Sequence, residues 1–267
     1  GQYIDGAALA RPAAGASAGA ARPSSASSTS SVSCSLFRRM ALFARLLPSQ
    51  CHICRAWPAP PICAGCLACF VRPEPRCLTC AAPLAGSAAQ CGECLLRPPP
   101  MSRTFAALSY GWPWDGLLAQ FKFHQQTGLA APLAAMLLQT PGVAQAVAEA
   151  DATVPVPASR QRLAARGYNP ALLLARALDA RRVVADALLR PHDAPPQRSL
   201  SRAQRLRRVQ NAFVPNPARR PALQGRHVLL IDDVMTTGAT LRAAAEALLR
   251  AGARQVSAAV LARTPPL

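Results

Sequence analysis

Two kinds of hydrophobic pattern alternate along the chain from residue 105 onward. Short runs of mostly apolar residues predict strands at residues 105–110, 153–157, 228–231 and 256–261, and the branched side chains of 228–231 favour a buried strand there. Stretches with helical spacing lie between these runs, at residues 115–138, 171–180 and 241–250. Strands that alternate with helices predict an α/β fold, with a mostly parallel sheet and helices on both of its faces.

Local signals mark the ends of these elements. The first helix should break near Thr127, Pro170 suits the first turn of the next helix, and Gly252 should stop the last one. Pro157 cannot continue a central ladder, so the second strand should end in a loop that holds the arginine-rich residues 159–169.

Three further segments have weaker patterns. Residues 35–47 predict a short amphipathic helix and residues 201–212 predict a basic helix. Residues 183–189 fit either the end of a helix or a strand.

Composition divides the chain into three parts. Residues 1–33 are rich in Ala, Gly, Ser and Pro and cannot build a core, so we expect a disordered tail. Residues 48–97 hold most of the cysteines, and three prolines at 98–100 form a stiff boundary. The sheet domain should then occupy residues 102–264. The tail is better explained by a start assigned too far upstream, with the true start at Met40 or near Val32.

The stretch from residue 228 to residue 241 carries the clearest candidate site. An apolar strand is expected to end at two acids, Asp232 and Asp233, because the carboxyl ends of parallel strands are where ligands bind. A loop of small residues and the start of a helix follow, and backbone N–H groups in such a loop suit a phosphate. Ionised carboxylates accept hydrogen bonds from sugar hydroxyls. The alternative is an ordinary turn with two solvated aspartates.

Eight of the ten cysteines form four Cys-x-x-Cys pairs. The pairs are Cys51/Cys54, Cys63/Cys66, Cys77/Cys80 and Cys91/Cys94. Two such pairs place four thiolates around one ion, so eight cysteines predict two structural zinc ions. Sequence order favours the first four on one ion and the last four on the other, although a crossed pairing stays open. A disulfide scaffold and an iron–sulfur cluster are the rival interpretations.

The charge balance is strongly basic and uneven. The formal net charge of the 267 residues is +18, and residues 160–226 hold 15 arginines against three aspartates. A field of this sign favours polyanions, either nucleic acid or a substrate with a pyrophosphate group, whereas a solvated basic surface is the alternative. No run of 18 apolar residues occurs, so the sequence predicts no transmembrane helix.

The 228–241 stretch resembles the phosphoribosyl diphosphate (PRPP) motif of type I phosphoribosyltransferases. The chain as a whole resembles the ComF family, a double zinc ribbon joined to a domain of phosphoribosyltransferase type. The resemblance rests on six features in one order along residues 48–264. They are the cysteine pairs, Val154-Pro155-Val156-Pro157, Arg166-Gly167-Tyr168-Asn169, Pro196-Gln197, Asn211-Ala212-Phe213 and the PRPP-like loop.

The resemblance implies roles for individual residues. Asp232 and Asp233 would bind the ribose hydroxyls, and Arg166 and Lys122 would contact the pyrophosphate with Mg²⁺. The loop around the 5′-phosphate would be Thr236, Thr237, Gly238, Ala239 and Thr240. Some relatives that act on purine bases carry a carboxylate where this chain has Thr236. The acceptor and the catalytic residue are therefore not identified, and the resemblance implies a phosphoribosyltransferase without establishing transfer.

The resemblance also implies a cellular setting. The family is associated with competence, the uptake of single-stranded DNA by transformable bacteria. We therefore expect a cytoplasmic protein, with a peripheral position at the inner membrane as an option. Its expected partners are PRPP or a 5′-phosphorylated nucleotide, single-stranded DNA, and a helicase or DNA-import protein. The alternative to an enzyme is a DNA-handling or partner-docking protein that uses the site to sense PRPP or a nucleotide.

Overall fold

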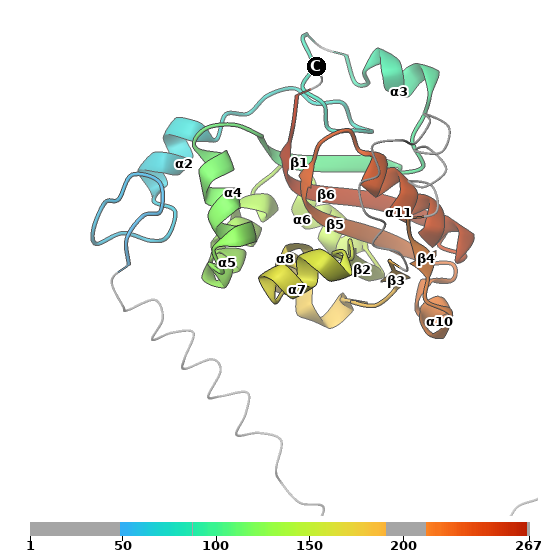
Figure 1. The fold of residues 1–267 in the computed structure, drawn as a ribbon. Coiled ribbons are helices and arrows are strands. Elements are labelled where there is room, and N and C mark those ends of the chain that lie inside the picture. The colour runs from blue at the N-terminus through green and yellow to red at the C-terminus, as the bar shows by residue number, and fades with distance from the viewer. Residues whose placement is uncertain (1–48, 87, 191–211, 266–267) are drawn as a thin grey trace, which may run out of the picture. The chain divides into compact units, whose positions relative to one another are not determined.

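A four-stranded parallel sheet organises the part of the chain that the structure describes (Figure 1). The computed structural model describes residues 49–86, 88–190 and 212–265. The order of the strands in the sheet is β1-β6-β5-β2. Their bounds are β1 Arg103–Ser109, β2 Ala152–Pro155, β5 His227–Met235 and β6 Gln255–Arg263. All four predicted strands are present, and the predicted fold class is confirmed.

The strands of this sheet end at different levels. The pairing of β2 with β5 stops at Pro155 opposite Ile231, after which only the Val156 N–H bonds to the Ile231 carbonyl. The pairing of β5 with β6 continues to Met235 opposite Arg263. The strand was predicted to end at Asp232 and Asp233, but β5 continues to Met235, because the long neighbour β6 keeps supplying partners after β2 has stopped.

Helices cover both faces of the sheet. Along β5, Val228 and Leu230 pack into a core that includes α11 (Ala239–Arg250). Leu229 and Ile231 pack into a second core, which includes α4 (Trp114–Phe123), α5 (Ala130–Leu138) and α8 (Pro170–Asp179). Side chains alternate across a strand, so a continuous apolar run supplies both cores at once.

The ends of the helices follow the local signals. The turn η1 (Thr127–Leu129) breaks the first helical stretch between α4 and α5. After α11, Gly252 has φ +100° and donates to the Leu249 carbonyl, while Ala253 donates to the Leu248 carbonyl. This pair of bonds is the Schellman ending that glycine favours.

Some elements differ from the sequence predictions. Residues 159–169 were expected in a loop, but they contain α7 (Arg160–Arg166), which Ser159 caps and Gly167 ends at φ +79°. The ambiguous stretch 183–189 contains a strand, β3. The remaining elements are α6 Val143–Glu149, η2 Ala180–Arg182, β3 Leu188–Leu189, β4 Val214–Pro215, η3 Pro217–Arg219 and α10 Arg220–Leu223.

The cysteine-rich segment packs against the cores of the sheet. It contains two short helices, α2 (Ala64–Phe70) and α3 (Gly92–Leu96). Ile62 belongs to the core that contains α4, and Cys77, Cys80 and Cys94 belong to the core that contains α11. Residues Pro48–Leu267 group as one compact unit.

The tail at residues 1–33 and the helices predicted at 35–47 and 201–212 lie outside the described residues. Among the helices that the structure describes, none has both the length and the apolar character needed to cross a bilayer.

Candidate functional site

Asp232 and Asp233 lie in the second half of β5, beyond the point where its pairing with β2 has ended. The Asp232 carboxylate accepts from the Asp233 N–H at 2.9 Å, and the Asp233 carboxylate accepts from the Val234 N–H at 2.6 Å. The two acids thus satisfy backbone donors in the stretch where β5 has no partner on the β2 side. Because neighbouring side chains of a strand point to opposite faces, the carboxylates flank the strand end from both sides.

Lys122 pairs with one of these acids. Its Nζ lies 2.9 Å from Oδ1 of Asp233, and both side chains are largely buried, at 18% and 14% exposure. Lys122 lies in the last turn of α4, and this position places the one lysine of the chain beside the acid pair. Lys122 is therefore not an exposed helix residue. Contact with a pyrophosphate stays a prediction, since the lysine contacts Asp233 in this structure.

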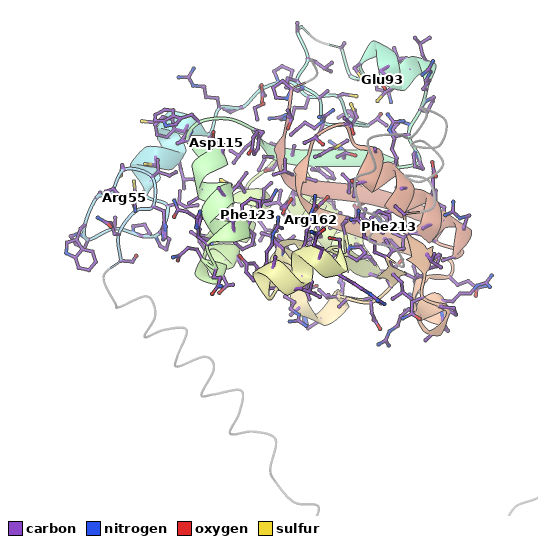
Figure 2. The ribbon with its side chains drawn as sticks, in the orientation of Figure 1. Arg55, Glu93, Asp115, Phe123, Arg162 and Phe213 are labelled. Carbon is purple, nitrogen blue, oxygen red and sulfur yellow. The ribbon has the colours of Figure 1, made fainter. Side chains whose placement is uncertain are left out.

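Electrostatics set the two acids apart. Burial and the neighbouring Asp233 carboxylate raise the pKa of Asp232 to about 7. The positive charges of Lys122 and Arg162 act in the opposite direction. Arg162 lies on α7, near the middle of the view in Figure 2. The sequence drew attention to Arg166 in this segment, whereas the charge that acts on Asp232 is that of Arg162.

The loop after the acids ends at a glycine with positive φ, directly before α11. Gly238 is the N-cap of α11 at φ +79°, and a Cβ there would lie 2.4 Å from Cε of Met235. The first bond along the helix runs from the Arg242 N–H to the Gly238 carbonyl, so the N–H groups at the start of the helix have no acceptor within it. The side chains of Thr236, Thr237 and Thr240 are exposed, as a ligand-binding loop requires.

The Arg166-Gly167-Tyr168-Asn169 segment braces the site. The Arg166 guanidinium stacks 4.4 Å from the ring centroid of Phe123, at the end of α4. The Tyr168 hydroxyl donates to the Phe121 carbonyl, and the Asn169 amide donates to the Val156 carbonyl at 2.9 Å. These contacts hold the α7–α8 connection against α4, which carries Lys122, and against the end of β2. The structure thus places Arg166 against Phe123 and does not bring it to the acid pair.

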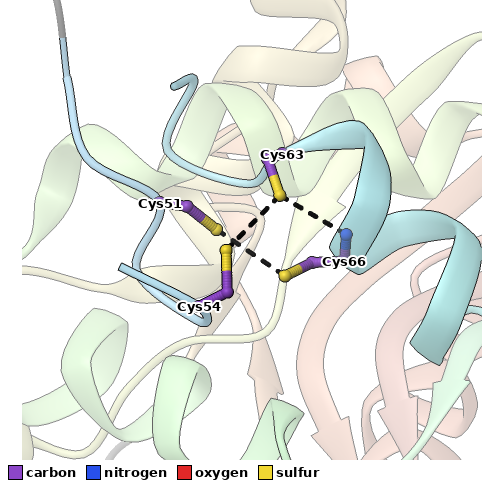
Figure 3. Close-up of side chains that lie close together, drawn as sticks. All are labelled: Cys51, Cys54, Cys63 and Cys66. Atoms are coloured by element: carbon purple, nitrogen blue, oxygen red, sulfur yellow. Dashed lines mark hydrogen bonds between the residues drawn. The ribbon is translucent and has the colours of Figure 1, made fainter. Parts of the chain in front are cut away.

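The eight paired cysteines form two groups of four, in sequence order. Within each group the sulfur atoms lie within 4.8 Å of one another. Figure 3 shows the first group, Cys51, Cys54, Cys63 and Cys66, with the four side chains converging. The crossed pairing is therefore excluded.

The spacing of the sulfurs fits a tetrahedral ion. The Cys51–Cys66, Cys54–Cys63 and Cys80–Cys91 sulfurs lie 3.8, 3.6 and 3.7 Å apart. Sulfurs at about 2.3 Å from a zinc ion lie about 3.8 Å apart in a tetrahedron, whereas a disulfide bond is about 2.05 Å long. All described cysteines are free thiols, which contradicts the disulfide interpretation. The two groups are therefore compatible with structural zinc.

Each cysteine group lies in a segment that contacts a different neighbour of the site. In the first group, Nδ1 of His52 lies 2.8 Å from Oε1 of Gln120, which is on α4 two residues before Lys122. In the second group, the Cys80 carbonyl accepts from Arg263, whose guanidinium also contacts the loop. Gln120 and Arg263 were missed by the sequence reasoning, because no local pattern marks a residue whose partners lie far away in the chain.

Comparisons with known proteins agree with this arrangement. Residues 163–266 match the phosphoribosyl transferase domain family. The chain is 32% identical over 234 residues to the DNA utilization protein YhgH of Escherichia coli K12, covering 82% of this chain and 98% of that protein.

Two competence proteins are also similar. The chain is 37% identical over 115 residues to competence protein ComFC of Bacillus subtilis, which covers 42% of this chain and 44% of the relative. It is 31% identical over 157 residues to competence protein F of Haemophilus influenzae, which covers 57% of this chain and 68% of the relative.

We expect purified protein to hold two zinc ions per chain, because each cysteine group offers four converging thiolates. Elemental analysis should show that Cys63→Ser loses one zinc ion. Cys69→Ser should keep both, since Cys69 is exposed and outside both groups. Iron in place of zinc, or an unchanged zinc content in Cys63→Ser, would contradict the assignment.

The raised pKa of Asp232 predicts a stability effect that depends on pH. Between its ordinary value of 3.8 and about 7, the unfolded chain ionises Asp232 while the folded protein keeps it protonated, so stability falls as pH rises. Asp232→Asn keeps the Oδ1 acceptor and should increase the free energy of unfolding of the ligand-free protein by roughly 1–3 kcal/mol at pH 8, but by little near pH 4.

Urea unfolding at the two pH values measures this effect. Asp186→Asn is the matched control, because its hydrogen bond with Arg219 lowers the pKa of Asp186. That variant should show no gain in stability at pH 8. A loss of stability in Asp232→Asn at pH 8 would show that the carboxylate is stabilising when ionised.

Proposed function

Since this chain belongs to the ComF family of competence and DNA utilization proteins, we propose that its acid pair and threonine–glycine loop bind the 5-phosphoribosyl group of PRPP. The observation that carries the proposal is the position of two carboxylates near the end of β5, with only residues 234–238 between them and the N-terminus of α11. The loop N–H groups suit the 5′-phosphate, and the carboxylates suit the vicinal hydroxyls of the ribose.

The charges around the site fit a ligand of this kind. PRPP brings a 5′-phosphate and a pyrophosphate, so the site must stabilise negative charge at two places. The loop and the start of α11 would bind the 5′-phosphate. Among the described residues, Lys122 and Arg162 are cations whose charges act on the acid pair, and we infer that they face the pyrophosphate. Lys122 would then exchange its contact with Asp233 for a contact with the ligand.

The acid pair also fits a bound metal complex of PRPP. Carboxylate oxygens are hard ligands that suit Mg²⁺, which keeps several of its waters in such sites. When bound, Mg²⁺ would neutralise part of the pyrophosphate charge. The half-buried Asp232 and Asp233 would hold the ribose from one side while the loop fixes the phosphate. Holding both ends of the sugar presents its anomeric carbon in a fixed orientation.

Transfer of the phosphoribosyl group to a nitrogen acceptor is the reaction that this geometry can support. Displacement of pyrophosphate develops positive charge on the ribose ring, which nearby carboxylates stabilise. The side chain of Thr236 is a hydroxyl and not a carboxylate, so it cannot take a proton from an attacking nitrogen base. We therefore propose PRPP binding as the function of the site, with phosphoribosyl transfer as its reaction class.

A second candidate function is the handling of single-stranded DNA. The relatives are named for DNA utilization and for competence. Arg160 and Arg162 are exposed on α7, next to the candidate site. A 5′-phosphorylated strand could place its terminal ribose at the acid pair and its next phosphates along α7. In this case the protein would act in the cytoplasm with a DNA-import or helicase partner, and its cysteine groups would form the docking surface.

We expect PRPP with Mg²⁺ to bind in a calorimetric titration, and the double variant Asp232→Ala/Asp233→Ala to bind at least about tenfold more weakly, equivalent to 1.4 kcal/mol. The matched control is Asp115→Ala/Asp186→Ala, which removes two acids away from the loop and should bind normally. Incubation with candidate bases and detection of released pyrophosphate tests transfer.

Equal binding by the two double variants would contradict the proposal, as would a wild-type protein that does not bind PRPP. If a 5′-phosphorylated oligonucleotide binds instead, with an affinity that falls steeply with salt, the second candidate function is supported.

A further inference from the structure

Arg263 is a buried cation at the end of β6. Arg263 is only 7% exposed. Within the described part of the chain, its guanidinium donates hydrogen bonds only to backbone carbonyls. Nε donates to the Cys80 carbonyl at 3.2 Å, and Nη1 donates to the Met235 carbonyl at 3.3 Å and to the Thr236 carbonyl. No ion pair joins it to a described carboxylate. Burying a charge without an acid partner costs free energy, so another group must compensate the charge of this guanidinium.

The second cysteine group would supply the missing negative charge if it held zinc. Four thiolates and one divalent ion carry a net charge of about −2. Cys80 belongs to this group, and its own carbonyl accepts from Arg263. The neighbouring Ala81 carbonyl accepts from Arg76, but that arginine has its own acid partner in Glu74. Arg263 is therefore the arginine whose charge the metal-loaded group balances.

Arg263 also orients the phosphate loop. In a trans peptide the N–H points away from the preceding C=O. The carbonyls of Met235 and Thr236 point at Arg263, so the N–H groups of Thr236 and Thr237 point away from it. The Thr264 N–H also bonds to the Met235 carbonyl, at 2.9 Å, which fixes the first of these peptides further. Arg263 thereby turns two loop donors outward.

We propose that Arg263 is a positioning residue that couples metal binding at the second cysteine group to phosphate binding at the loop. Loss of the metal leaves the guanidinium without its counter-charge, and the two loop peptides lose their fixed orientation. By thermodynamic linkage, a phosphate ligand must in turn tighten the hold of the second group on its metal. The phosphate half of this coupling rests on the function proposed above, whereas the effect of the metal on the loop does not.

The first cysteine group has no such connection to the loop among the described residues. Its contact runs from His52 to Gln120 on α4, and hence toward Lys122. The two groups therefore make different predictions. Loss of the metal from the second group should alter the loop, while loss of the metal from the first group should alter α4 near Gln120 and Lys122.

The ligand-free part of the test is an NMR comparison of the amide resonances of Thr236, Thr237 and Gly238. We expect Arg263→Gln and Cys91→Ser to shift or broaden these resonances. Arg76→Gln removes the hydrogen bond to the Ala81 carbonyl, next to Cys80, without removing a contact with the loop among the described residues, and Cys63→Ser empties the first group, so both variants should leave the resonances unchanged. If Arg263→Gln does not fold, the same amide resonances are compared in Arg263→Lys, Cys91→Ser and Cys63→Ser. Unchanged loop resonances in Cys91→Ser would overturn the proposal.

The second part measures zinc release to a chelator, with and without ribose 5-phosphate. We expect the ligand to raise the zinc affinity of the second group of Cys63→Ser, measured at equilibrium against the chelator, by about threefold or more, and to have no such effect once Arg263→Gln is added. An equal rise in both proteins would overturn the coupling. If ribose 5-phosphate does not bind while the loop resonances still respond to Cys91→Ser, the proposed function fails but the metal-to-loop connection stands.

Discussion

The unequal length of three neighbouring strands is the constraint on which the site depends. β2 stops pairing at Pro155, while β5 and β6 run on together to Met235 and Arg263. This step uncovers one edge of β5 where Asp232 and Asp233 lie, so that two carboxylates can face a ligand without leaving the sheet. The same register places Arg263 opposite Met235, within reach of the loop carbonyls. Acid pair, loop and buried arginine therefore follow from one feature of the sheet.

The cysteine segment contributes to the site from two directions. The first group contacts α4, which brings Lys122 to Asp233, and the second group contacts the loop through Arg263. A further link joins Glu93 of α3 to Arg242 of α11 at 4.0 Å. An exposed ion pair of this length is weak on its own. The second group is nevertheless tied to the helix whose N-terminus the phosphate would meet, because its cysteines share a core with α11.

Sequence reasoning identified what is local and missed what is distant. The acid pair, the glycine at the helix start and the spacing of the cysteines are local patterns, and the structure has each of them. The end of β5 was misplaced because it depends on how far β6 extends. Arg162 and Arg263 were not singled out, since their importance comes from partners on other elements. An arginine-rich composition hides such residues among many similar ones.

The central claim, that the acid pair and the loop hold a phosphorylated ribose, is tested most directly by a crystal structure of the protein with ribose 5-phosphate and Mg²⁺. We expect the phosphate at the N–H groups of residues 236–240, and the ribose hydroxyls within hydrogen-bond distance of Asp232 and Asp233. A phosphate bound on α7 with an empty loop, or a ribose turned away from both acids, would contradict this claim.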